Sequence, residues 1–279
     1  MNVLAVTSQV VYGHVGGQAA VLPLQLMGHE VWHLPTVLYS NHPAHGGFTG
    51  KMLAPERLEA LLHGLAERGF LDRAAAILSG YLGRPETAEL VADTVRTLRA
   101  SGRDLVYCCD PVLGDDGRLY VEADLVELIA QRLAPKADIV TPNRYELGLL
   151  TAMPVETPAE VLSAAKQLRH AGAGIVVCTS AEVSETIVTT IAATEAGCFA
   201  VDTVFRKGVP HGTGDLFAAA FLARYLDDRN AEESLRHAAA VVDRAISVSL
   251  EMATGELELV AARAALARPE PLPELRRLD

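Results

Sequence analysis

The chain has few of the features that mark secreted, disulfide-bonded or membrane-spanning proteins. Only four of its 279 residues are cysteine and none forms a C-x-x-C pair, so buried free thiols in a reducing compartment are expected. No apolar run approaches the roughly 18–20 residues of a membrane-spanning helix. The first residues, M-N-V-L-A-V-T, carry no basic segment and are expected to form a strand, not a signal peptide. These shortages predict a soluble, cytoplasmic protein without a membrane partner.

Positive charge is also scarce. The chain has 24 Lys and Arg against 35 Asp and Glu, a formal net charge of −11, which argues against nucleic acid as a partner. The negative charge does not exclude a small anionic substrate, because backbone N–H groups or a metal ion can bind one locally. Half of the residues are hydrophobic, which is enough for a sizeable core.

Several familiar catalytic motifs are missing. The chain contains no G-x-x-x-x-G-K-[ST] phosphate loop, and no G-x-G-x-x-G follows its first predicted strand. It also lacks H-E-x-x-H and G-x-S-x-G. These absences argue against a P-loop NTPase, a Rossmann dehydrogenase, an H-E-x-x-H zinc protease and an α/β-hydrolase.

What the chain does contain is a regular alternation of strands and helices. Six short apolar runs, each followed by a helical pattern, predict strands at 3–6, 30–39, 74–78, 105–109, 137–140 and 175–178. Pro35 is expected to break the second, and 40–51 is expected to be a loop. Such alternation predicts an α/β fold with a doubly wound, mostly parallel sheet and helices on both faces. Runs at 186–193 and 198–201 predict a small antiparallel edge, and the absence of a linker favours one domain over 1–279.

Polar residues follow these strands at one end. Ligands of doubly wound sheets bind beyond the carboxyl ends of the strands, so the position of these residues predicts an active site there. The residues are Ser8, Ser40–His45, Ser79–Tyr81, Asp110, Thr141–Asn143 and Thr179–Ser180.

The segment H-G-T-G-D, residues 211–215, stands directly before an apolar helical run. The free N–H groups of a helix start attract anions, and glycines let the backbone approach one closely. Asp215 at the rim of such a turn is a candidate general base. The alternative is that Asp215 simply caps the helix.

Acidic side chains supply a second possible site. Carboxylate and amide oxygens suit Mg²⁺, and the candidates are Asp110, Asp115, Glu146, Asp215 and Asn143. The spacing Asn143-x-x-Glu146 is equally typical of a capping box at a helix start. Asp110 before Pro111 is compatible with a plain strand end, Tyr81 with a packed aromatic ring, and His42 and His45 with ordinary loop histidines.

Six segments, in this order, resemble the pyridoxal kinases of the ribokinase-like superfamily over nearly the whole chain. They are S-Q-V-V-Y-G-H-V-G (8–16), T-V-L-Y-S-N-H (36–42), S-G-Y-L-G (79–83), C-D-P-V-L-G-D (109–115), A-D-I-V-T-P-N-x-x-E (137–146) and G-T-G-D-L-F (212–217). The resemblance implies a ribokinase-like fold and transfer of the ATP γ-phosphate to the 5′-hydroxymethyl group of pyridoxal, pyridoxine or pyridoxamine in vitamin B6 salvage. It also implies Mg²⁺ as cofactor and a homodimer, and it leaves a monovalent-cation requirement open.

The resemblance also assigns roles to residues. It makes Asp215 the base and the backbone of Gly212, Thr213 and Gly214 the anion hole. The implied substrate side comprises Ser8, His42, Pro43, Ala44, Tyr81 and Asp215. The implied ATP side comprises Asp110, Thr141, Asn143, Glu146, Thr179, Ser180 and Thr213, with Asp110, Asn143 and Glu146 at the metal and Tyr120 as a lid.

The sequence departs from the family on the substrate side. Many relatives have Thr after S-N-H, whereas this chain has Pro43 and then Ala44, so a substrate-side hydroxyl is lost. A hydroxymethylpyrimidine kinase or another small-alcohol kinase of the same fold is therefore an alternative, although the first loop lacks the G-A-G-I-Q pattern of the pyrimidine kinases. A protein that binds B6 without turnover is a second alternative.

Overall fold

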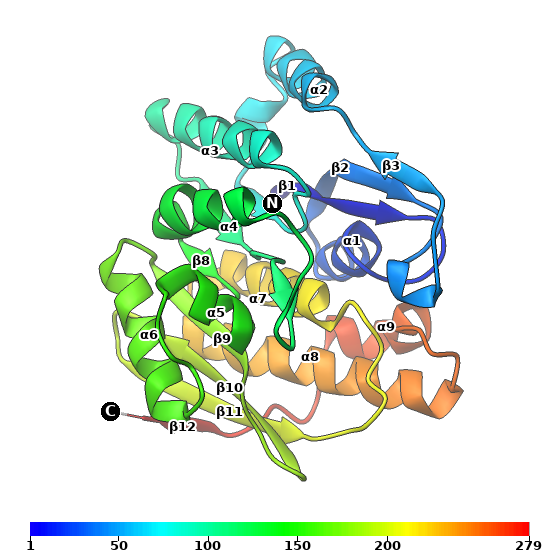
Figure 1. The fold of residues 1–279 in the computed structure, drawn as a ribbon, viewed down its shortest axis with the longest axis vertical. Coiled ribbons are helices and arrows are strands. Elements are labelled where there is room, and N and C mark those ends of the chain that lie inside the picture. The colour runs from blue at the N-terminus through cyan, green and yellow to red at the C-terminus, as the bar shows by residue number, and fades with distance from the viewer. Residues whose placement is uncertain (279) are drawn as a thin grey trace.

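The computed structural model describes residues 1–278 and has the predicted α/β architecture (Figure 1). Its large sheet has the strand order β12-β11-β10-β9-β8-β5-β4-β1-β2-β3. The parallel strands at its centre are β1 (Asn2–Val10), β2 (Glu30–Tyr39), β4 (Ala76–Ser79), β5 (Val106–Cys109), β8 (Ile139–Val140) and β9 (Ile175–Val183). The doubly wound parallel sheet predicted from the sequence is thereby confirmed.

Antiparallel strands flank this parallel centre. β3 (Gly50–Met52) pairs with β2 at one edge of the sheet. At the other edge the antiparallel strands are β10 (Ile187–Ala193), β11 (Cys198–Val204) and β12 (Leu275–Arg277). The predicted antiparallel pair is confirmed, whereas the outermost strand β12, close to the C-terminus in Figure 1, was not predicted.

Helices cover both faces because strand residues alternate between two hydrophobic cores. In β1, Leu4 and Val6 belong to one core, and Val3 belongs to the other. The first core is covered by α2 (Pro55–Glu67), α3 (Pro85–Ala100), α4 (Ala123–Leu128), α5 (Arg144–Thr151) and α6 (Pro158–His170). The second is covered by α1 (Gly17–Leu26), α7 (Thr213–Asp228), α8 (Ala231–Met252) and α9 (Leu259–Ala267).

Two local predictions were wrong. Pro35 does not break the second strand: it lies within β2, opposite Thr7 of β1. β3 begins to pair only at Val37, so proline, which has no N–H, costs no hydrogen bond to β3. Residues 40–51 are not a plain loop either, because they include a 3₁₀ turn at Pro43–His45 and the start of β3.

A short hairpin, β6 (Gly114–Asp115) with β7 (Arg118–Leu119), follows β5 and stands apart from the main sheet. No helix among residues 1–278 is long and apolar enough to cross a bilayer.

Candidate active site

The glycine turn, residues 211–215, adopts a conformation that requires glycine at position 212. Gly212 is the N-cap of α7, with φ of 94° and a hydrogen bond from Leu216 N–H to its carbonyl oxygen. A Cβ atom at Gly212 would lie 2.1 Å from the carbonyl oxygen of His14. The turn is therefore pressed against the loop that follows β1, and the first turn of α7 directs its free N–H groups away from the helix.

Asp215 is the third residue of α7, so the alternative that it caps the helix is wrong. Its carboxylate accepts hydrogen bonds from the backbone N–H of Gly16 and from its own N–H. Burial nevertheless raises its pKa from 3.8 to about 6. At neutral pH it is an ionised carboxylate with a raised proton affinity, as a general base requires.

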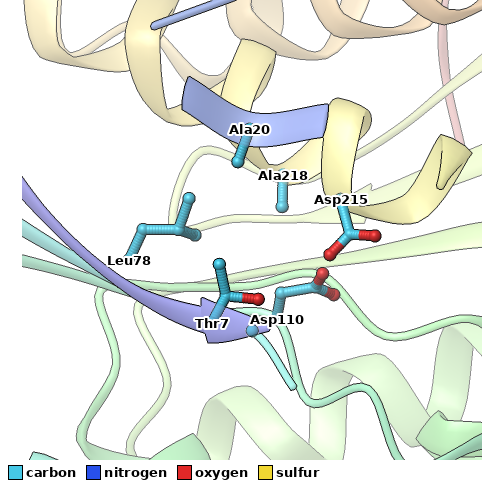
Figure 2. Close-up of a pocket in the computed structure, with 7 residues that line it drawn as sticks. Thr7, Ala20, Leu78, Asp110, Asp215 and Ala218 are labelled. Carbon is cyan, nitrogen blue, oxygen red and sulfur yellow. The ribbon is translucent and has the colours of Figure 1, made fainter. Parts of the chain in front are cut away.

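Figure 2 shows the carboxylates of Asp215 and Asp110 pointing toward one another across a small cavity of about 10 Å³. The cavity is lined by Thr7, Ala20, Leu78, Gly80, Asp110, Asp215 and Ala218. The buried Thr7 hydroxyl has no hydrogen-bond partner among residues 1–278. Burial, and next to it the charges of Asp215 and Glu146, raise the pKa of Asp110 well above its usual range. Two acidic side chains thus lie close together where β1, β5 and α7 meet.

Asn143 and Glu146 form the capping box at the start of α5. The Asn143 side chain accepts the Glu146 N–H at 2.9 Å, and Glu146 Oε2 accepts the Asn143 N–H at 2.9 Å. Glu146 Oε1 also accepts the Leu113 N–H at 2.8 Å, while burial raises the pKa of this carboxyl to about 7. The capping alternative is realised, and the metal role of both residues stays a prediction.

The residues expected on the ATP side lie at the ends of β5 and β8 and, contrary to the prediction that they follow a strand ending at 178, Thr179 and Ser180 lie within β9. Thr141 donates its hydroxyl to Asp110 Oδ1 at 3.1 Å, and Asn143 forms a parallel bridge with Thr179. Ser180 follows with a left-handed φ of 50°, a conformation that directs the chain locally out of the regular strand. These five residues from β5, β8 and β9 are brought together as the sequence predicted.

The residues expected on the substrate side gather around the other flank of the turn. A Cβ at Gly16 would lie 2.0 Å from Ser8 Oγ, so Ser8 is next to the loop that holds Asp215. The rings of His42 and His211 are in contact, tilted by 31° with centroids 4.4 Å apart, which places His42 directly beside the glycine turn. Tyr81 is partly buried, and burial with the nearby Tyr39 raises its pKa. Pro43 and Ala44, in the 3₁₀ turn after His42, are exposed.

Tyr120, the expected lid, directly follows β7. Its N–H donates to Leu113 O at 2.9 Å, and its side chain is exposed. Burial and the neighbouring Asp115 raise its pKa, so the ring stands near the acidic part of the site. Movement of this residue over a ligand stays a prediction.

Four contributors were missed in the sequence. Gly16 belongs to a segment that resembles the family, but the sequence assigns it no role, whereas in the structure its N–H orients Asp215. The sequence assigns no role to Thr7 or to His211. Glu256 accepts the His14 N–H of the loop after β1, with 3.3 Å between His14 N and Glu256 Oε2. It comes from a distant part of the chain and belongs to no motif that could have revealed this contact.

Comparison with known proteins gives consistent results. Residues 61–259 match the family model for phosphomethylpyrimidine kinase. Pyridoxal kinase PdxY of Deinococcus radiodurans is 40% identical, with 100% of this chain and 97% of the relative covered. The same kinase of Rubrobacter xylanophilus is 38% identical over 96% of this chain and 94% of the relative. The solved structure of pyridoxal kinase from Leishmania donovani in complex with ADP and pyridoxamine superposes with a TM-score of 0.94 at 29% identity, covering 100% of this chain and 99% of that one.

Proposed function

The chain belongs to the pyridoxal kinases within the phosphomethylpyrimidine kinase family, and on this premise we propose that it phosphorylates the 5′-hydroxymethyl group of pyridoxal with ATP. Pyridoxine and pyridoxamine are the other proposed acceptors, and the product from pyridoxal is pyridoxal 5′-phosphate. The observation that carries the proposal is Asp215, a half-buried carboxylate beside a glycine turn, held by the Gly16 N–H at the carboxyl end of the sheet.

Asp215 would accept the proton of the attacking hydroxyl as the oxygen bonds to the γ-phosphorus. The N–H groups of Gly212, Thr213 and Gly214 would stabilise the charge that develops on the transferring phosphoryl group. Phosphoryl transfer depends mainly on positioning and charge stabilisation, and the loss of a single hole donor typically costs about 3–4 kcal/mol of barrier.

The acceptor would lie between the loop after β1 and the segment around His42. Ser8 would bind the polar edge of the pyridine ring, and Tyr81 would pack near the ring. Pro43 and Ala44 would make apolar contacts with the acceptor where many relatives have a Thr hydroxyl. His42 is held in this position by the packing of its ring against the His211 ring.

ATP would bind where β5, β8 and β9 end, with its phosphates directed to the glycine turn. Thr141, Thr179, Ser180 and Thr213 are the proposed hydroxyl contacts. Mg²⁺ fits beside Asp110, because Thr141 is the sole hydrogen-bond donor to this buried carboxylate within the described chain and the nearby acidic groups favour a cation. When bound, Mg²⁺ offsets charge on the phosphates, and Asn143 and Glu146 would orient its waters.

Glu146→Gln tests this arrangement. Because the neutral amide no longer attracts the hydrated cation, the Mg²⁺ concentration for half-maximal activity is expected to rise by about tenfold. The measurement is a Mg²⁺ titration at saturating ATP. Glu160→Gln is the matched control, since Glu160 holds the same capping-box position on α6 and, unlike Glu146, is not buried. An unchanged titration for Glu146→Gln would leave Glu146 with its capping role alone.

We also propose one kinase domain over residues 1–279 and a homodimer. Four large apolar side chains on and beside β2 and β3 support the dimer because they are exposed: Val11, Tyr12, Leu38 and Phe48. Light scattering of the dilute protein measures the assembly. The cytoplasmic location is supported by the small number of cysteines, four in the whole chain, all of which are buried.

A hydroxymethylpyrimidine kinase is the second candidate, favoured by the description of the matching family model. The two functions differ in the acceptor and share the phosphoryl-transfer residues. The test is identification of the product after incubation with MgATP and pyridoxal, with pyridoxal 5′-phosphate as the expected product. Absence of ATP-dependent product from all three B6 vitamers would refute the proposal.

A further inference from the structure

Glu256 joins two loops of the substrate side from a distant part of the chain. It lies between α8 and α9, and its side chain is only 12% exposed. One oxygen, Oε1, is 2.6 Å from His45 Nε2 in the 3₁₀ turn. The other, Oε2, accepts the backbone N–H of His14 at 3.3 Å. A single carboxylate thus bridges the loop after β1 and the turn at Pro43–His45.

The loop after β1 is shaped to admit this carboxylate. Gly13 has φ of 90°, and a Cβ atom there would lie 2.4 Å from Glu256 Oε2. Any other residue would push the carboxylate away from the His14 N–H. The Tyr12 ring meets His45 edge-on, with centroids 5.9 Å apart, which adds a second contact between the same two loops.

Glu256 is itself anchored to the glycine turn. Its neighbour Leu257 is fully buried, and Leu257 Cδ1 would be 3.3 Å from a Cβ atom at Gly212. The Glu258 N–H donates to Ser249 Oγ at 2.8 Å, which fixes the loop to the end of α8. Through Glu256 and Leu257, the two substrate-side loops are therefore fixed relative to the same turn that carries the phosphoryl-transfer groups.

The 3₁₀ turn has two side-chain anchors to distant elements. The His42 ring packs at a tilt against the His211 ring, with centroids 4.4 Å apart, and His45 contacts Glu256. Pro43 and Ala44 between them offer no polar side chain. The 3₁₀ turn therefore contributes to acceptor binding chiefly through its position, because Pro43 and Ala44 offer the acceptor no hydrogen bond from a side chain.

We propose that Glu256 is a positioning residue that, through His45 and His14, holds these two loops closed over the acceptor and so sets the affinity for it. Glu256 acts at a distance from the reacting atoms and from the ATP side. The inference rests on the proposed function, since the acceptor is taken to be a B6 vitamer.

The test uses the full-length variants Glu256→Gln, His45→Gln and the double variant. Each is expected to raise KM for pyridoxal by about fivefold, with kcat within about twofold of the parent and KM for ATP unchanged. The double variant is expected to resemble Glu256→Gln alone, because His45 acts only through its contact with Glu256. Glu258→Gln is the matched control: its carboxylate bonds to Thr254 in the same loop, and its KM for pyridoxal should equal the parent's.

Amide hydrogen exchange provides a readout independent of turnover. Residues 12–16 and 42–48 of Glu256→Gln are expected to exchange faster than in the parent, while α3 stays unchanged. An unchanged KM for pyridoxal in Glu256→Gln, an equal rise in KM for ATP, or additive effects in the double variant would overturn the inference. If the parent phosphorylates no vitamer, the proposed function fails, and unchanged exchange in Glu256→Gln would overturn the link itself.

Discussion

Replacing Asp215 by asparagine is expected to lower kcat with pyridoxal by about 10²–10⁴-fold. Asparagine keeps the shape of the side chain and can still accept the Gly16 N–H, but it cannot take the proton of the attacking hydroxyl. ATP binding should be nearly unchanged, because the proposed nucleotide contacts are made by the side chains of other residues. Single-turnover kinetics and ATP titration on the same preparation measure both. A kcat near that of the parent would remove Asp215 from the mechanism.

The same substitution is expected to stabilise the protein at alkaline pH. The folded-state pKa of Asp215, about 6, lies above its ordinary value of 3.8, so the folded protein binds the extra proton. The stability contributed by the neutral carboxyl is complete below pH 3.8 and is lost as pH rises through about 6. Asparagine cannot ionise, so at pH 8 the free energy of unfolding of Asp215→Asn should exceed that of the parent by about 1 kcal/mol, which raises the melting temperature by a few degrees. Near pH 4 the difference should vanish. A lower melting temperature at pH 8 would contradict the burial argument.

Gly212→Ala is expected to be as damaging to turnover by a different route. The methyl group would lie 2.1 Å from the His14 carbonyl oxygen, a backbone atom that cannot move without the loop after β1. The turn and that loop must separate, which displaces the N–H groups of the anion hole and the Gly16 N–H that orients Asp215. We expect kcat to fall by at least about 10²-fold, the cost of losing hole donors. Steady-state kinetics of the folded variant, verified by circular dichroism, measure the loss.

Gly208→Ala is the control for backbone strain. Gly208 also has a left-handed φ, 72°, but a Cβ atom there would meet nothing within 4 Å. This variant carries the conformational cost of about 1–2 kcal/mol without the collision, and its kcat should stay within about twofold. Equal losses of kcat in the two variants would show that strain, and not the displaced turn, is responsible.

The fold was predictable because its signals are local. Each buried parallel strand is a short apolar run, and each is followed by polar residues that meet at one end of the sheet. The placement of Asp215 after two glycines at a helix start was visible for the same reason. The Asn143 and Glu146 spacing was also visible, but one pattern serves both a capping box and a metal site, and the structure shows the box.

The remaining features depend on contacts between distant residues. His14 and Glu256 are 242 positions apart, and no periodicity or motif links them. The Gly16 N–H can orient Asp215 only because α7 packs beside α1 in the second core. Pro35 was expected to break β2, and it is tolerated because β3 does not extend to its level, a fact of sheet topology alone.

The central claim is that this chain phosphorylates the hydroxymethyl group of a B6 vitamer with Asp215 as base. The most direct measurement is kcat/KM for pyridoxal, pyridoxine and hydroxymethylpyrimidine, determined side by side with MgATP across pH 5 to 8. The expected result is a preference for pyridoxal over the pyrimidine of about tenfold or more, with activity falling as pH drops through about 6. Preferential turnover of the pyrimidine would contradict the assigned substrate, and a rate independent of pH between 5 and 7 would contradict the assigned base.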